Sequence, residues 1–338
     1  MRTIGVLTGG GDAPGLNPAI KGLVYRASEH GIKVVGLYDG WRGLLDPMPE
    51  VLPLDRGLVR RWDRDGGTNL GSSRTNPFHS RDASGAHADR SREVVGNISR
   101  LALDAVVACG GEDTLGFDTA LRNVTEIIDR SRTPAGSHGW VQIVEVMGRH
   151  AGHLALWSGV AGQADLVLIP EHPFSYRKVY RHLRERLGDT TNLARDPARP
   201  RYSVVVVAEG AHSEEGELVT VDAGRDAFGH ARLGGVGESL ARRIMSETPY
   251  DARSVMIGHP QRGGAPSPVD RVMGMMFGAR AADAVAGGQY GKMVSARGVA
   301  PACELSLVDL GCVLGGLNTV DVERHYDTDR YHLKGIGM

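Results

Sequence analysis

The sequence predicts an α/β protein built from two doubly wound lobes, each with a parallel sheet between layers of helices. Short runs of β-branched and other apolar residues alternate along the chain with segments of helical period. These runs are apolar on both faces, which is typical of strands in a parallel sheet buried under helices. With 338 residues, the chain is long enough for two domains of roughly 150 residues each.

The predicted strands follow one another in a regular order. RTIGVLT leads into the helical pattern NPAIKGLVYRASEH, and the next strands read KVVGLYD and ALDAVVACG. Later strands read WVQIVEV, ADLVLI, YSVVVVAEG and ARSVMIG. Residues 187–201 have little apolar content, so we expect a solvated surface loop there rather than a mobile lid.

Composition excludes several classes of protein. The 39 Lys and Arg residues balance 40 Asp and Glu residues, so the whole molecule is not attracted to nucleic acid or to an acidic membrane. No segment reaches the roughly 18 apolar residues of a membrane span. Cys109, Cys303 and Cys312 have no metal spacing and are too few for a disulfide framework. We therefore expect a cytoplasmic protein whose anion sites are local.

Glycine marks the first candidate site. The 47 glycines are about twice the usual share of roughly 7% and cluster at corners between strands and helices. In LTGGGDAPGLNPAI, Gly9, Gly10 and Gly11 can bring backbone N–H groups close to a phosphate. Asn17 is placed to cap the next helix and Pro18 suits its first turn. The loop matches neither common nucleotide-binding motif, and a tight turn without a ligand is the alternative.

Two further corners carry charge suited to phosphoryl transfer. Arg74 lies in a loop rich in glycine and hydroxyl residues, where a guanidinium can bridge two anionic groups, although a surface arginine is the simpler interpretation. Glu112 and Asp113 follow a predicted strand and a double glycine. Adjacent carboxylates repel unless a cation compensates, so these two favour Mg²⁺, with a solvated acidic turn as the alternative.

The second half of the chain carries polar residues after several predicted strands. Arg149 follows WVQIVEV and Glu209 ends the next long strand. Arg253, His259 and Arg262 belong to the run ARSVMIGHPQRGG. We expect all three to lie at the same carboxyl edge of the sheet, where α/β proteins bind ligands. Arginine and histidine suit a phosphate monoester and glutamate suits sugar hydroxyls. Each residue alone could be an ordinary ion pair.

In their order along the chain, these motifs resemble bacterial-type 6-phosphofructokinases, particularly the actinobacterial branch. The resemblance rests on GGGDAPGLN, GSSRTNP, GGEDTL, GFDTA, EVMGRHAG, AEGA and GHPQRGG. It implies two α/β lobes with the active site between them, usually in a homotetramer whose neighbouring subunit completes the sugar-phosphate site. The implied reaction is glycolytic: a phosphoryl group moves from ATP or pyrophosphate to O1 of fructose 6-phosphate with Mg²⁺. Lys21 and Tyr25 partly match the family's effector site.

Residue roles follow from the resemblance, position by position. Asp113 stands where pyrophosphate users have aspartate and ATP users usually have glycine, so it favours pyrophosphate. The donor lobe is expected to span residues 1–121 and 260–309, and the sugar-phosphate lobe 122–259 and 310–338. The implied donor residues are Gly11, Arg74, Gly111, Glu112, Asp113 and Thr114, with the metal at Glu112. The implied sugar-phosphate residues are Met147, Gly148, Arg149, Glu209, Arg253, His259 and Arg262.

The chain departs from the family at the GGEDTLGFDTA junction. In the family, a helix, a strand and a loop reading roughly P-K-T-I-D-N-D separate GGEDTL from GFDTA. Here Leu115 runs directly into Gly116, so a helix-plus-strand unit of roughly 30 residues is expected to be absent. The aspartate that accepts the sugar hydroxyl proton lies in that unit. Asp118 and Asp113 are the remaining candidates for the base, although Asp118 is also placed to cap a helix.

A second departure concerns substrate binding, and it leaves the activity open. The family's S-H-x-R segment, whose arginine reaches the neighbouring subunit's sugar phosphate, here ends in Trp140. One hypothesis is an active 6-phosphofructokinase that forms homodimers or homotetramers. A second is a catalytically silent sugar-phosphate-binding paralogue that joins an intact kinase as a regulatory subunit. A third is an enzyme resembling NAD or lipid kinases, whose GGDGT corner is similar to GGEDT.

Overall fold

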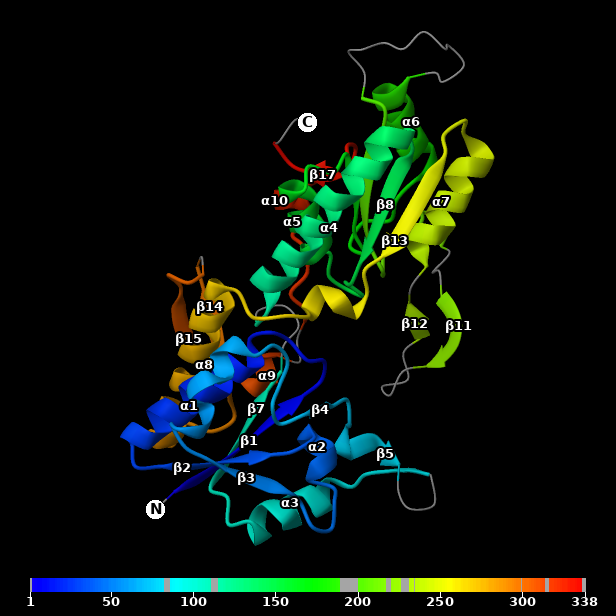
Figure 1. Ribbon diagram of the computed structural model, residues 1–338. Coiled ribbons are helices and arrows are strands. Elements are labelled where there is room, and N and C mark those ends of the chain that lie inside the picture. The colour runs from blue at the N-terminus through cyan, green and yellow to red at the C-terminus, as the bar shows by residue number, and fades with distance from the viewer. Residues whose placement is uncertain are drawn as a thin grey trace. The chain divides into compact units, whose positions relative to one another are not determined.

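The computed structural model describes residues 2–81, 86–110, 115–188, 200–216, 220–225, 231–233, 235–298, 300–313 and 316–335. The chain forms two compact units, which can be followed by colour in Figure 1. The first comprises Met1–Thr119 and Arg262–Gly316, and the second Ala120–Gln261 and Leu317–Met338. Both units are built on parallel strands with helices between them, so the predicted α/β class is confirmed.

A five-stranded sheet forms the centre of the first unit. β1 lies between β2 and β7, and both run parallel to it, with Ile4 opposite Val34 on one side and Ala105 on the other. β4 pairs with the end of β1, and β3 adds an antiparallel edge to β2. The strands are β1 Thr3–Gly9, β2 Lys33–Leu37, β3 Val51–Leu54, β4 Ser72–Ser73 and β7 Ala105–Cys109.

Helices cover both faces of this sheet. On one face Ile4 and Val6 pack with residues of α1 and α8. On the other face Leu7 packs with Val94 of α3. The helices are α1 Leu16–Glu29, α2 Gly40–Gly43, α3 Ser91–Arg100, α8 Pro268–Ala286 and α9 Leu310–Val313, with 3₁₀ turns η1 Leu58–Arg64 and η2 Pro77–His79. Two small hairpins complete the unit: β5 Ser80–Arg81 with β6 His87–Ala88, and β14 Lys292–Arg297 with β15 Glu304–Asp309.

Glycines allow α1 and α8 to lie in direct backbone contact, side by side in Figure 1. A Cβ atom on Gly278 would lie 1.9 Å from the carbonyl oxygen of Ala19, and one on Gly22 would lie 2.1 Å from that of Met275. Real Cβ atoms do not approach oxygen that closely. The sequence therefore needs glycine at both positions for these two helices to share one face of the sheet.

β7 is less buried than its apolar sequence predicts. Ala108 is exposed and the other four residues of the strand are only half-buried. Among the described residues β7 pairs with β1 alone, so its outer edge has no neighbouring strand there. The prediction of a strand covered on both faces is wrong for β7, because the elements of the described chain leave all five of its residues at least partly exposed.

The second unit has a four-stranded, entirely parallel sheet of order β13-β8-β10-β9. Every residue of β8 and of β10 is buried. In the register, Val141 lies opposite Ala252 on one side and Ser203 on the other. The strands are β8 Val141–Val146, β9 Leu166–Leu168, β10 Ser203–Ala208 and β13 Ala252–Met256. All four predicted strands of this half are confirmed.

Long helices and a C-terminal segment enclose this sheet. Val124 and Ile128 of α4 belong to its core, and Tyr326 and Tyr331 of the C-terminal segment are also buried there. The helices are α4 Phe117–His138, α5 His153–Ala161, α6 Tyr176–Leu187, α7 Val236–Glu247 and α10 Val322–His325, with the turn η3 His259–Arg262. The remaining strands are β11 Thr220–Arg225, β12 Ala231–Leu233, β16 Tyr326–Asp327 and β17 His332–Leu333.

Two further expectations concern a surface loop and membrane spans. α6 ends at Leu187, and most of the predicted loop 187–201 lies outside the described residues. In the described part of the chain, no helix is both long enough and apolar enough to cross a membrane.

Candidate active site

The glycine corner after β1 is tied to the loop that carries Arg74. Gly10 donates its N–H to the carbonyl oxygen of Ser73 at 2.9 Å, and Ser72 Oγ donates to the carbonyl oxygen of Gly10 at 2.8 Å. Gly10 has a φ of 90°, a backbone conformation that favours glycine. These bonds bring Gly11 and Arg74, each next in the chain to a bonded residue, to the same end of the sheet. Arg74 is half-buried and makes no hydrogen bond or ion pair with other described residues.

Asn17 has a different role from the predicted one. α1 begins at Leu16, so Asn17 lies inside the helix and the prediction that it caps this helix is wrong. Its fully buried amide instead holds the loop before Arg74: Nδ2 donates to the carbonyl oxygen of Asp65 and Oδ1 accepts the N–H of Asn69. Asn17 makes these tertiary hydrogen bonds instead of capping the helix, because both ends of its amide find backbone partners in that loop.

The corner after β7 lies beside the corner after β1. A Cβ on Gly110 would lie 3.3 Å from the carbonyl oxygen of Gly9, and one on Gly116 would lie 2.6 Å from Pro14 Cδ. The described residues on both sides of this corner therefore contact the β1–α1 loop. The predicted donor and metal residues Gly111, Glu112, Asp113 and Thr114 themselves lie outside the described residues.

Asp270, which the sequence reasoning missed, caps the helix after this corner. Its buried carboxylate accepts the N–H of Gly116 at 3.0 Å and the N–H of Thr119 at 2.7 Å. Asp118 lies in the first turn of α4, half-buried, with no hydrogen bond or ion pair to described residues. The expected capping role of Asp118 is thus taken by Asp270. The S-P-V-D pattern predicts the start of α8, where Ser267 is the N-cap, but gives no signal for a cap on another helix.

In the second unit, the turn after β8 lies against the end of β10. Gly210 donates its N–H to the carbonyl oxygen of Gly148 at 3.1 Å, and a Cβ on Gly210 would lie 2.0 Å from the carbonyl oxygen of Arg149. The N–H of Gly148 points to Glu209 Oε1 at 3.5 Å. The structure therefore brings together the predicted residues Met147, Gly148, Arg149 and Glu209.

The turn η3, which contains His259 and Arg262, approaches from the neighbouring strand. Its contact to β8 is made by Gln261, whose Oε1 accepts the N–H of Met147 at 3.4 Å. Sequence reasoning missed Gln261, and its only signal was its place between two candidate residues in GHPQRGG.

Arg253 lies at the other end of the sheet. β13 begins at Ala252, so Arg253 is near the amino end of the strand, beside Gln142 of β8. Its guanidinium lies 5.8 Å from the ring centroid of Trp140 and donates to Asp251 Oδ1 at 2.7 Å. The prediction that β13 delivers Arg253 to the carboxyl edge is wrong, because the strand advances about 3.3 Å per residue between Arg253 and His259.

Internal carboxylates occupy the amino ends of two helices near the second unit's carboxyl edge. Glu171 accepts the N–H of Gly152 at the start of α5 at 2.8 Å, and Glu145 accepts those of Gly235 and Gly237 at the start of α7 at 3.0 and 2.8 Å. Burial raises the pKa of Glu145, the two N–H groups lower it, and the charge of Glu209 raises it further. These two helix ends are thus satisfied by the protein itself.

The amino end of α1 differs from these ends. Its N-cap is Gly15, no side chain caps it, and no acidic residue lies in its first turn. Leu16 and Ala19 donate their N–H groups to the carbonyl oxygens of Ala13 and Gly15, and Pro18 has no N–H, so the helix start contributes mainly its dipole to an anion beside the glycine corner. In the first unit, the α1 start, the glycine corner and Arg74 thus offer positive charge together.

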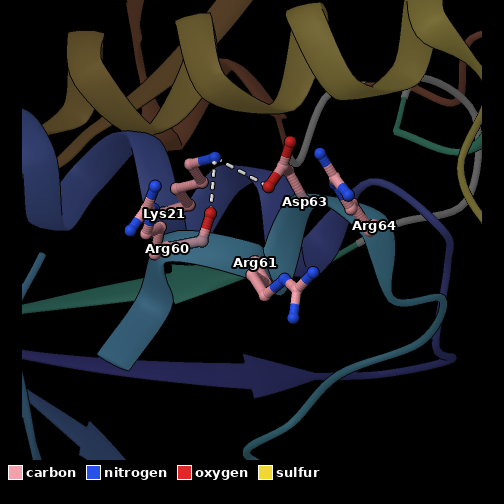
Figure 2. Close-up of a pocket in the computed structure, with 5 residues that line it drawn as sticks. All are labelled: Lys21, Arg60, Arg61, Asp63 and Arg64. Carbon is pink, nitrogen blue, oxygen red and sulfur yellow. Dashed lines mark hydrogen bonds and ion pairs between the residues drawn. The ribbon is translucent and has the colours of Figure 1, made fainter. Parts of the chain in front are cut away.

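A separate pocket in the first unit is strongly cationic. It has a volume of about 410 Å³ and is lined by Lys21, Arg60, Arg61, Asp63 and Arg64. Figure 2 shows Lys21 joined to Asp63 Oδ1, at 2.7 Å, and to the carbonyl oxygen of Arg60, at 3.0 Å. The three arginines form no ion pair within the described chain, so a small anion fits this pocket. None of the predicted donor or sugar-phosphate residues lines it.

The described residues contain no group of three or more His, Cys, Asp or Glu side chains that could hold a metal ion. The predicted metal residue Glu112 lies outside those residues.

Proteins of known name are similar to this chain over nearly its whole length. A pyrophosphate–fructose 6-phosphate 1-phosphotransferase of Streptomyces coelicolor is 41% identical over 354 residues, covering 94% of this chain and 96% of the relative. An ATP-dependent 6-phosphofructokinase 3 of the same organism is 38% identical over 358 residues, covering 96% and 98%.

Solved structures share the fold. A pyrophosphate-dependent phosphofructokinase from Nitrosospira multiformis has a TM-score of 0.78 at 16% identity, covering 99% of this chain and 89% of that one. The phosphofructokinase of Saccharomyces cerevisiae has a TM-score of 0.74 at 23% identity, covering 93% of this chain and 45% of that one. The family model described as Phosphofructokinase matches residues 3–115 and 112–285. With most of its length matched, this chain belongs to the phosphofructokinase family.

Proposed function

We propose that this protein binds fructose 6-phosphate and a phosphoryl donor and transfers the phosphoryl group to O1 of the sugar, as a cytoplasmic step of glycolysis. This proposal rests on the two neighbouring corners of the first unit, one after β1 and one after β7. The glycine corner after β1, the uncapped start of α1 and the loop of Arg74 gather phosphate-binding groups beside the end of β7. In the second unit, the Met147–Arg149 turn against Glu209 supports a sugar-phosphate site.

The two units would divide the chemistry between them. The backbone of the glycine corner at Gly11, together with Arg74 and the dipole of α1, would hold the transferred phosphoryl group while charge spreads over its oxygens. Arg149, His259 and Arg262 would hold the 6-phosphate, and Glu209 would orient sugar hydroxyls. Mg²⁺, held by Glu112 and the donor's oxygens, would supply neutralisation of the donor's charge.

Pyrophosphate is the donor that we propose. Asp113 is the residue that favours it, and several relatives, including the one from Dictyoglomus thermophilum at 41% identity, are named as pyrophosphate-dependent. Other relatives of similar identity are named as ATP-dependent, so ATP is the second donor to be tested.

We further propose that the helix-plus-strand unit with the family's catalytic aspartate is absent, which makes transfer slow. The alignment to the first Streptomyces relative runs over 354 residues, more than the 338 in this chain, so that relative has positions without a counterpart here. The family match is split into two segments that meet at residues 112–115. The half-exposed β7, without a strand on its outer edge in the described chain, also supports a missing neighbour.

Asp118 is our candidate for the replacement base. Its carboxylate lies in the first turn of α4, close in sequence to the corner, and Asp270 relieves it of capping that helix. A positioned base typically contributes about 10² to 10⁴-fold to such a reaction, so a misplaced one would leave only weak transfer.

Assembly from several copies completes the proposal. Arg253 lies at the amino end of the second unit's sheet, so it would contribute to the sugar phosphate of another copy rather than its own. We therefore expect a homodimer or homotetramer. A hetero-oligomer with an intact kinase is the arrangement of the second candidate function.

That second candidate is a silent paralogue that binds sugar phosphate and regulates an intact kinase. Trp140 favours it, because an indole in the place of the family's arginine supplies no charge to a sugar phosphate. The alternative of an NAD or lipid kinase has no comparable support, since residues 3–285 match the phosphofructokinase model.

One experiment separates these functions. Purified protein is incubated with fructose 6-phosphate, Mg²⁺ and either pyrophosphate or ATP, and fructose 1,6-bisphosphate is measured at the endpoint. Arg149→Ala is the test variant, and Arg130→Ala, an exposed arginine on α4, is the matched control. Product that is lost only in Arg149→Ala supports the kinase. Fructose 6-phosphate binding by calorimetry without product supports the silent paralogue, and neither binding nor product rejects both.

A further inference from the structure

Gln261 is a fully buried amide that joins three elements of the second unit. Its Oε1 accepts the N–H of Met147 after β8 at 3.4 Å, and its carbonyl oxygen accepts Asn123 Nδ2 of α4 at 3.1 Å. Its own N–H points to the carbonyl oxygen of Gly258 at 3.3 Å. Gln261 is therefore the link through which η3 holds the first residue of the Met147–Arg149 turn.

The other end of this amide has no partner. Nε2 is buried and forms no hydrogen bond with any described residue. The orientation of the amide is set by the N–H of Met147, because turning it over would place two donors against each other. A buried donor without an acceptor is costly, and an apolar side chain of the same shape would avoid that cost.

Gln142 shows how the same side chain behaves when its role is only structural. It is also buried, at the amino end of β8. Its Oε1 accepts Trp140 Nε1 at 3.1 Å, and its Nε2 donates to the carbonyl oxygen of Ile143 at 3.2 Å. Both ends of Gln142 are satisfied within the protein, whereas Gln261 keeps one donor unused at the carboxyl edge.

The turn that Gln261 contacts is fixed on its other side by β10. Gly210 donates to the carbonyl oxygen of Gly148, and Gly148 has a φ of 146° that favours glycine. A turn held between two strand ends has little freedom, so Gln261 controls where the backbone of Met147 lies. That backbone precedes Arg149, the predicted phosphate ligand.

From these contacts we infer that Gln261 is a positioning residue of the sugar-phosphate site: Oε1 holds the Met147–Arg149 turn, and the unused Nε2 donor is completed when an oxygen-rich ligand binds. This inference rests on the proposed sugar-phosphate function of that turn. It adds a role for a side chain that the sequence motif alone did not assign. The ligand class is a phosphorylated sugar. In the free protein Nε2 has no acceptor, and the hydroxyl and phosphate oxygens of such a sugar are acceptors.

Two substitutions separate the two ends of the amide. Gln261→Glu keeps an acceptor for the N–H of Met147 but removes the donor, and Gln261→Met removes both at similar volume. The matched control is Asn97→Leu, which replaces another buried amide, in the first unit, whose Nδ2 donates to the carbonyl oxygens of Leu44 and Asp46 at 2.8 Å each.

The first readout is fructose 6-phosphate binding to the whole protein, measured by titration calorimetry. Gln261→Met is expected to raise the Kd by about tenfold or more, the loss of one hydrogen bond to the ligand, and also to lower the Tm without ligand, because the N–H of Met147 loses its acceptor. Asn97→Leu is expected to lower the Tm and leave the Kd unchanged. An unchanged Kd in Gln261→Met overturns the inference.

The second readout needs no ligand and separates this inference from the proposed function. Hydrogen exchange of the Met147–Arg149 amides is expected to be faster in Gln261→Met and close to that of the original protein in Gln261→Glu. Equal exchange in all three proteins overturns the positioning role even if sugar phosphate binds. If the original protein binds no fructose 6-phosphate, the proposed function is wrong, and so is the proposal that the ligand accepts a hydrogen bond from Nε2. The hydrogen-exchange rates still decide whether Gln261 holds the Met147–Arg149 turn.

Discussion

The two sheets have similar apolar strands but very different cover. All residues of β8 and β10 in the second unit are buried, whereas Ala108 of β7 in the first unit is exposed and its neighbours are half-buried. The strand sequences, AVVAC in one unit and SVVVVA in the other, do not explain the difference. Burial of a parallel strand depends on what lies beside and above it, so the first unit depends more on its α1–α8 layer.

The largest expected effect breaks that layer. Gly278→Ala places a Cβ where the carbonyl oxygen of Ala19 lies at 1.9 Å, so the helices must separate. We expect a loss of about 3 kcal/mol in the free energy of unfolding, measured by urea denaturation. Gly96→Ala is the matched control: Gly96 lies on the exposed face of α3 with no atom within 4 Å of its Cβ, so this substitution should gain about 0.5 to 1 kcal/mol. Equal effects of the two substitutions would contradict the close α1–α8 contact.

A second prediction compares the sheets directly. Val144→Ala in fully buried β8 should cost about 2 kcal/mol, because it leaves a cavity among packed side chains. Val107→Ala in half-buried β7 should cost about 1 kcal/mol or less, because water already reaches part of that site. Urea denaturation of both variants measures the difference. If Val107→Ala costs as much as Val144→Ala, β7 is covered in solution, and the next measurement is the oligomeric state of the protein.

Sequence reasoning succeeded where apolar pattern decides the structure and failed where a tertiary partner decides it. The strands and the α/β class followed from apolar runs, which need no knowledge of their neighbours. Asn17 and Asp270 could not be assigned, because each bonds backbone far away in the sequence.

The misplacement of Arg253 could have been avoided from the sequence. The run ARSVMIG begins at Ala252, as β13 does, so Arg253 is the second residue of the strand and cannot share an end of the sheet with His259, which follows the strand. Gln261 was hidden for another reason, since an unpaired amide nitrogen is visible only once its surroundings are known.

The third prediction uses pH on the second unit. Burial raises the pKa of Glu145 in the folded protein despite the two N–H groups of α7. The folded state therefore binds the proton more tightly than the unfolded state, and stability falls as the pH rises from the ordinary pKa of glutamate through the raised one. Glu145→Gln should remove this slope from a series of Tm values measured across that pH range. Glu238→Gln, on the exposed face of α7, is the control and should leave the slope in place.

The smallest effect concerns ion pairs at the α1–α8 layer, where the pH dependence has the opposite sign. Burial raises the pKa of Asp283, but hydrogen bonds from His30 and Arg26 outweigh it and lower the pKa overall. Its stabilisation is therefore present above the ordinary pKa of aspartate and is lost as the pH falls through the lowered one. Because the pairs are partly exposed, Asp283→Asn should cost less than about 1 kcal/mol at pH 7. This cost should shrink as the pH falls through the lowered pKa of Asp283, because its carboxylate then becomes protonated and loses its charge. A cost comparable to that of Gly278→Ala would show that charge, rather than close backbone packing, holds this layer together.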